Sequence, residues 1–194
     1  LYGLSPDQVV KRINVDTEIV GIGFGFSFEW PTCRDLVNDI RKKFPNALLL
    51  GGGEHLTAMP EQTMQDTELD IGILGEGEEI AVEVARAYQA GALDPSKILG
   101  VTFKSPSGEV IQNGRRPRKL ELDEMAWPAW DLVPIENYLR RGYGFGVNRG
   151  RSMPVMASRG CPYQCTFCSN PAMWTTRWIP RDQDLLLDEM SYYQ

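Results

Sequence analysis

Three of the chain's four cysteines lie within one short segment, CPYQCTFC. Cys161, Cys165 and Cys168 have the spacing C-x3-C-x2-C. Three thiolates at this spacing can ligate three irons of one 4Fe–4S cluster and leave the fourth iron open to a small molecule. A structural zinc site or an electron-carrying cluster would need a fourth ligand, and the candidates His55 and Cys33 lie more than a hundred residues earlier. The spacing therefore predicts an open iron–sulfur cluster.

The composition excludes several classes of protein. The chain has 194 residues, of which 42% are hydrophobic and 24% charged, as expected for one or two folded domains. Its net charge of −6 disfavours nucleic acid as a partner. No apolar run is long enough to predict a membrane span. The uneven distribution of the cysteines is unlike a secreted disulfide framework, so we expect a reducing, cytoplasmic location.

The elements before the cysteines alternate in type. Apolar runs ending in glycine predict strands, and apolar residues at helical spacing predict the helices between them. This alternation predicts an α/β fold with a parallel, doubly wound sheet. Residues 98–112 are expected to form a β-hairpin, a short strand is expected within 152–160, and a helix within 180–193. The earlier strands are expected at 19–26, 46–53 and 70–77, and the helices at 5–13, 31–44, 60–65 and 78–91.

The segment around the cysteines, SRGCPYQCTFCS, resembles the signature of the radical S-adenosylmethionine (radical SAM) superfamily. This resemblance implies that Cys161, Cys165 and Cys168 hold the cluster and that the open iron chelates S-adenosylmethionine. One electron from the cluster then cleaves that molecule to a 5′-deoxyadenosyl radical. Phe167 is implied to lie near the adenine, and the alternative is an aromatic side chain packed within the loop.

The first half of the chain resembles a domain that accompanies this signature. GGGEHLTAMPEQT and DIGILGEGEE are similar to the cobalamin-binding domain of cobalamin-dependent radical SAM proteins, which include methyltransferases and the anaerobic Mg-protoporphyrin monomethyl ester cyclase. The resemblance implies three parts. Residues 1–95 would be a partial, Rossmann-like cobalamin-binding domain, truncated at its N-terminus. Residues 96–150 would be a linker with a β-hairpin, and residues 151–194 the first β/α unit of a C-terminally truncated radical SAM partial TIM barrel.

The resemblance also implies contacts with cobalamin at the ends of the strands. Glycines there would let the chain pass close to the nucleotide tail, although tight turns need glycine for their own reasons. His55 is interpreted as a loop-packing residue or a tail contact, and Cys33 as an inert core thiol. The residues implied to contact cobalamin are Ser27 after the first strand, Gly51, Gly52 and Gly53 after the second, and Gly75, Glu76 and Gly77 after the third.

These features together imply an enzyme that transfers a methyl group to an unactivated carbon or performs an oxidative cyclisation. The implied partners are a small-molecule substrate and an electron donor such as flavodoxin or ferredoxin. We expect the 194 residues to be a fragment that is inactive by itself. The alternatives are a methylthiotransferase, which would carry more N-terminal cysteines than Cys33, a non-catalytic iron–sulfur or zinc-binding module, and a corrinoid carrier.

Overall fold

The computed structural model describes residues 4–142 and 150–193, which form two compact units. The first unit comprises Leu1–Arg118 together with Tyr163–Thr175. The second comprises Lys119–Pro162 and Thr176–Gln194. The segment Tyr163–Thr175, which contains the second and third cysteines of the motif, therefore packs with the first unit, although it lies far from the rest of that unit in sequence.

A five-stranded sheet in the order β1-β2-β3-β4-β5 forms the centre of the first unit. The first three strands are parallel, as their alternation with helices predicts, and the hairpin adds β4 antiparallel to β3 and β5 antiparallel to β4. The hairpin, which we expected in the linker, is thus part of this sheet. The strands are β1 (Ile19–Gly23), β2 (Leu48–Gly52), β3 (Ile71–Ile73), β4 (Val101–Lys104) and β5 (Val110–Gln112).

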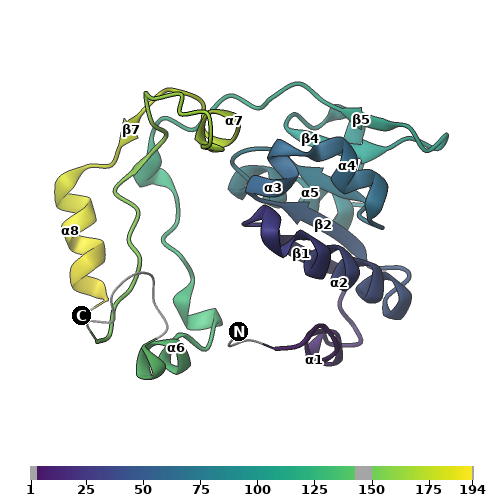
Figure 1. The fold of residues 1–194 in the computed structure, drawn as a ribbon, viewed down its shortest axis with the longest axis horizontal. Coiled ribbons are helices and arrows are strands. Elements are labelled where there is room, and N and C mark those ends of the chain that lie inside the picture. The colour runs from purple at the N-terminus through teal and green to yellow at the C-terminus, as the bar shows by residue number, and fades with distance from the viewer. Residues whose placement is uncertain (1–3, 143–149, 194) are drawn as a thin grey trace. The chain divides into compact units, whose positions relative to one another are not determined.

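Helices cover both faces of the sheet, which confirms the α/β fold class (Figure 1). On one face, α2 (Trp30–Lys43), α3 (Glu54–Ala58) and α4 (Pro60–Asp66) enclose a core built around Leu49. On the other face, α5 (Glu78–Gln89) packs Ile80 and Val84 against Leu50 and Ile73. Two shorter helices complete the unit, namely α1 (Pro6–Arg12), which Ser5 caps, and α7 (Asn170–Met173).

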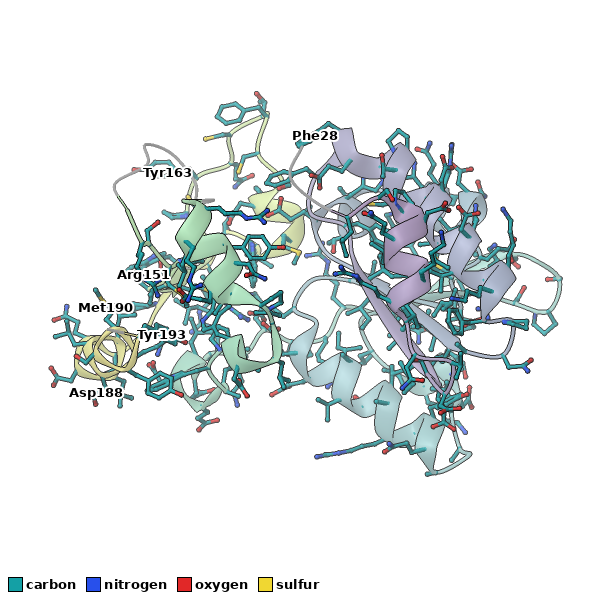
Figure 2. All side chains as sticks on the ribbon, turned by 90° about the horizontal axis from the view of Figure 1, so that it is seen from below. Phe28, Arg151, Tyr163, Asp188, Met190 and Tyr193 are labelled. Atoms are coloured by element: carbon teal, nitrogen blue, oxygen red, sulfur yellow. The ribbon has the colours of Figure 1, made fainter. Side chains whose placement is uncertain are left out.

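The second unit is held together by one arginine rather than by a large apolar core. Arg181 pairs with Asp123 at 2.8 Å and with Glu189, whose side chain is only 3% exposed. Leu186, Met190 and Tyr193 lie at helical spacing in the last segment, but Met190, which Figure 2 labels, is exposed, whereas Glu189 is buried. The elements are α6 (Ile135–Arg141), β6 (Ser158–Arg159), which pairs antiparallel with β7 (Ile179–Pro180), and α8 (Gln183–Tyr192).

None of the helices in the described ranges has the length and apolar character that crossing a membrane requires.

Candidate functional site

A cavity of about 420 Å³ lies at the carboxyl ends of the three parallel strands, where open α/β sheets bind ligands. Its floor is the α5 face of the sheet, with Leu50 and Ile73, and its rim is made of the loops that follow β2 and β3. Of the residues expected to contact cobalamin, six line this cavity: Gly51, Gly52, Gly53, Gly75, Glu76 and Gly77.

The glycines of the cavity differ in why they must be glycine. A Cβ on Gly51 would lie 2.5 Å from Leu69 Cδ1, and a Cβ on Gly53, whose φ is +105°, would lie 2.6 Å from the carbonyl oxygen of Phe24. Internal packing therefore accounts for these two. By contrast, a Cβ on Gly21 would meet nothing within 4 Å, and one on Gly52 would meet only Ile73, at 3.8 Å. Gly21 and Gly52 thus leave empty space that an apolar ligand can fill.

Ser27, the remaining residue expected to contact cobalamin, does not line the cavity and lies at the start of a short helical turn after β1. Its hydroxyl forms a 2.9 Å hydrogen bond with Nδ1 of His55, the chain's single histidine. The imidazole is 6% exposed and stacks on Trp30, with the ring centroids 4.6 Å apart. Burial lowers the pKa of His55 below its ordinary value of 6.5, so the ring is neutral at pH 7. Loop packing therefore describes this residue well.

One hydroxyl group joins the two glycine loops of the cavity. The Thr57 hydroxyl donates a hydrogen bond of 2.9 Å to the Gly53 carbonyl and accepts one of 3.0 Å from the Gly75 amide. Sequence reasoning missed this residue because the helix that carries it, α3, begins without a capping side chain. The stretch was read as loop, with only the following helix expected.

The cysteine motif is divided between the two units. Cys165 and Cys168 belong to the first unit and Cys161 to the second. The Cys168 amide donates to the Cys165 carbonyl at 3.1 Å, which makes a tight turn with both thiols exposed. In the ranges described, no three His, Cys, Asp or Glu side chains are gathered as around a metal ion. The donor set, three thiols without disulfides, nevertheless suits an iron–sulfur cluster, whose ligands often gather only when it binds.

Phe167 and Cys33, the other two residues singled out from the sequence, have contrasting environments. The Phe167 side chain is 92% exposed, so the alternative that it packs within the loop is wrong. Cys33 packs against the core beneath α2, and burial, followed by the nearby Glu29 carboxylate, raises the pKa of its thiol. A high pKa leaves little thiolate at pH 7, which agrees with the interpretation of Cys33 as an inert core thiol.

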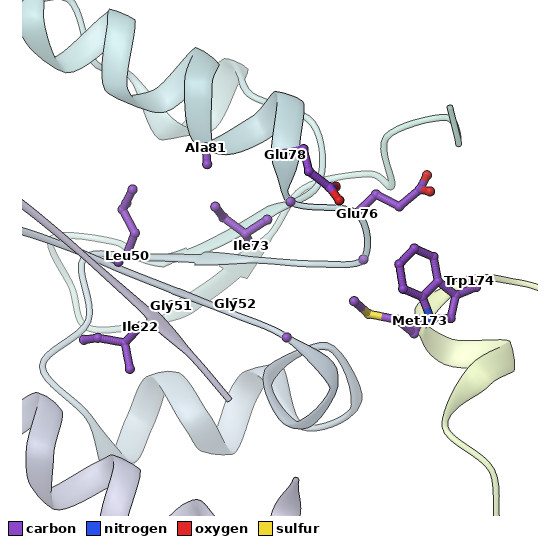
Figure 3. A pocket seen from close by; sticks show the side chains of 14 residues that line it. Ile22, Leu50, Gly51, Gly52, Ile73, Glu76, Glu78, Ala81, Met173 and Trp174 are labelled. Atoms are coloured by element: carbon purple, nitrogen blue, oxygen red, sulfur yellow. The ribbon is translucent and has the colours of Figure 1, made fainter. Parts of the chain in front are cut away.

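The segment after the cysteines supplies the outer wall of the cavity. Met173 and Trp174 line it opposite the loop that carries Glu76 (Figure 3). The Ser169 hydroxyl donates to the Glu54 carboxylate at 3.1 Å. Sequence reasoning placed neither contact, because the two partners are separated by about a hundred residues and no local pattern connects them.

A family model for the B12 binding domain matches residues 2–85. An uncharacterized methyltransferase of Pyrococcus horikoshii is 32% identical over 95% of this chain and 38% of its own length. The anaerobic magnesium-protoporphyrin IX monomethyl ester cyclase of Cereibacter sphaeroides is 32% identical over 75% of this chain and 23% of its own. The chain thus spans well under half the length of these relatives.

A solved structure shares the fold over nearly the whole chain. The radical SAM methyltransferase TsrM of Kitasatospora setae, solved with cobalamin and a 4Fe–4S cluster bound, superposes with a TM-score of 0.69 and 22% identity. The match covers 96% of this chain and 37% of TsrM. Residues 2–85 therefore match the B12 binding domain, and the fold of this chain is similar to that of TsrM.

Proposed function

We propose that this chain is the cofactor-binding part of a cobalamin-dependent radical SAM enzyme that transfers a methyl group to an unactivated carbon or performs an oxidative cyclisation. When bound, the cluster and S-adenosylmethionine supply a 5′-deoxyadenosyl radical, and cobalamin supplies a methyl carrier. The methyltransferase and cyclase relatives support both outcomes. The residues of this chain bind and orient those groups.

One observation carries the proposal: the cavity of the B12 binding domain is completed by residues that directly follow the cysteine motif. Gly21 and Gly52 leave its floor open, while Met173 and Trp174 close its outer side. The wall that would contact cobalamin and the turn that would hold the cluster are therefore parts of one short stretch of chain. This arrangement is expected of a protein that uses both cofactors together.

In this proposal Cys161, Cys165 and Cys168 are the cluster ligands, and the exposed ring of Phe167 contacts S-adenosylmethionine. The backbone amide of Asn170 donates a hydrogen bond of 3.4 Å to Cys168 Sγ. Ser27, held by His55, contacts the cobalamin tail from outside the cavity. The loop of Gly75, Glu76 and Gly77 contacts cobalamin from the side of β3.

A zinc-binding module is the second candidate, and the surroundings of two residues weigh against it. Closing a zinc site needs a fourth ligand. The His55 ring is buried between Ser27 and Trp30, and the Cys33 thiol faces the core beneath α2. The His55 side chain is therefore buried and the Cys33 side chain partly buried inside the first unit. The same position of Cys33 weighs against a second cluster of the methylthiotransferase type.

Metal analysis after anaerobic reconstitution with iron and sulfide tests the cluster. We expect about four iron atoms per chain, and loss of most of the iron in Cys161→Ala, Cys165→Ala and Cys168→Ala. Cys33→Ala is the matched control and should retain it. One zinc per chain, or equal iron in all four variants, would contradict the proposal.

The reaction requires the full-length protein. With a reducing flavodoxin or ferredoxin, that protein should form 5′-deoxyadenosine from S-adenosylmethionine only when the cluster is present. Mass spectrometry of the product then separates methyl transfer, which adds one carbon, from cyclisation, which adds none.

A further inference from the structure

The segment Tyr163–Thr175 is held to the first unit by several independent contacts. Its helix α7 packs against α3, the helix that follows the β2 glycines. The Glu54 carboxylate, at the first position of α3, accepts the hydrogen bond from Ser169. On the other side, Arg115 donates a 2.7 Å hydrogen bond to the Ala172 carbonyl. The segment is therefore attached in its middle, at Ser169, and near its end, at Ala172.

The attached segment changes the shape of the cavity. In the structure α7 packs on α3, an arrangement that we call the seated state. In this state Met173 and Trp174 line the cavity. The seating is close, because a Cβ on Gly75 would lie 3.5 Å from the Met173 carbonyl oxygen. The guanidinium group of Arg118 lies 5.8 Å from the centre of the Trp174 ring, at the distance of a cation–π interaction. A ligand in the cavity would thus touch both the domain and the segment.

We propose that Glu54 is a positioning residue that couples the two cofactor sites by seating the cysteine turn on the cobalamin domain. This inference rests on the proposed function. A cobalamin that contacts Met173 and Trp174 binds the seated state more tightly than the unseated one. By linkage, packing of the segment on the domain raises the affinity for cobalamin by a certain factor. Bound cobalamin raises the equilibrium constant for that packing by the same factor. Ser169 directly follows Cys168, so the seating also sets the position of a cluster ligand.

Hydrogen–deuterium exchange on the 194-residue chain, with and without hydroxocobalamin, measures this coupling directly. We expect hydroxocobalamin to slow exchange of the amides between Ser169 and Thr175. We also expect Glu54→Gln to weaken hydroxocobalamin binding about tenfold, because glutamine can still accept from Ser169 but lacks the charge that strengthens this hydrogen bond. Glu61→Gln, the same exchange on the neighbouring helix α4 and outside the cavity, is the matched control and should bind normally.

Ser169→Ala removes the same hydrogen bond from the segment side and serves if Glu54→Gln fails to fold. The double variant should bind hydroxocobalamin no more weakly than Ser169→Ala alone, because both substitutions act on the same hydrogen bond between Ser169 and Glu54. Additive losses would mean that Glu54 acts elsewhere and would overturn the proposal. Hydroxocobalamin binding with unchanged exchange at 169–175 would also overturn it while leaving the proposed function intact. An absence of any hydroxocobalamin binding by the parent chain would instead remove the proposed function.

Discussion

At the scale of single residues, the two kinds of cavity glycine should respond differently to substitution. Gly21→Leu fills open space at the cavity floor, so we expect hydroxocobalamin affinity to fall at least about tenfold with little change in melting temperature. Gly51→Ala instead forces a methyl group into Leu69, Phe24 and Leu56, and should lower the unfolding free energy by about 1–3 kcal/mol. Calorimetric titration and denaturant unfolding separate the two effects. Equal loss of affinity and stability in both variants would contradict this division.

The buried histidine should make stability depend on pH. The folded state holds the pKa of His55 below 6.5, so below that pH the unfolded chain binds more protons. The contribution of His55 to the unfolding free energy should therefore be constant above about pH 7.5 and should decrease as the pH falls below 6.5.

Denaturant unfolding followed by tryptophan fluorescence measures this loss. His55→Asn removes the titration and, since the chain has one histidine, should flatten the profile in that range. A profile of the same slope in His55→Asn would show that other groups are responsible.

At the scale of elements, the second unit depends on the ion pairs of Arg181. Arg181→Met leaves the buried Glu189 carboxylate without its cation and should destabilise the unit by about 3–5 kcal/mol. Arg140→Met breaks an exposed pair on α6 and should cost less than about 0.5 kcal/mol. The near-ultraviolet circular dichroism of the cluster formed by Trp127, Tyr192 and Tyr193 reports the difference, because these rings lie within 7 Å of one another in this unit.

The same arginine shows why one element was predicted in place but not in orientation. The helix α8 was expected from its apolar spacing, yet the side it buries carries Glu189. Hydrophobic periodicity treats a carboxylate as an exposed residue, and a buried ion pair with an arginine earlier in the chain reverses that assignment.

Elements supported by local patterns were correctly predicted from the sequence. The Ser5 cap of α1 and the left-handed Gly91 after α5 are both present, and β1 and β2 end in glycine, whereas β3 ends at Ile73. Contacts between distant residues were not predictable in this way. Neither the seating of α7 on α3 nor the hydrogen bond from Ser169 to Glu54 leaves a local signal, so six of the residues around the cavity were anticipated but its outer wall was not.

At the scale of the whole molecule, a cofactor bound to one unit should stabilise that unit selectively. A ligand at a hundred times its dissociation constant stabilises its binding state by about 2.7 kcal/mol. Hydroxocobalamin should therefore slow exchange of the β2 amides, which lie in the core of the first unit, by about a hundredfold. Amides of α8 in the second unit should change little. Similar protection of α8 and β2 would show that the two units unfold as one.

The hydroxyl of Thr57 has a consequence for how readily the cavity accepts a ligand. Because it bonds to both Gly53 and Gly75, the two loops keep a fixed spacing before anything binds. Such preorganisation spares the ligand the entropy of ordering them. Thr57→Val keeps the shape of the side chain but removes the hydroxyl. In that variant the two loops would move independently. Its ligand would enter a site that must first be assembled.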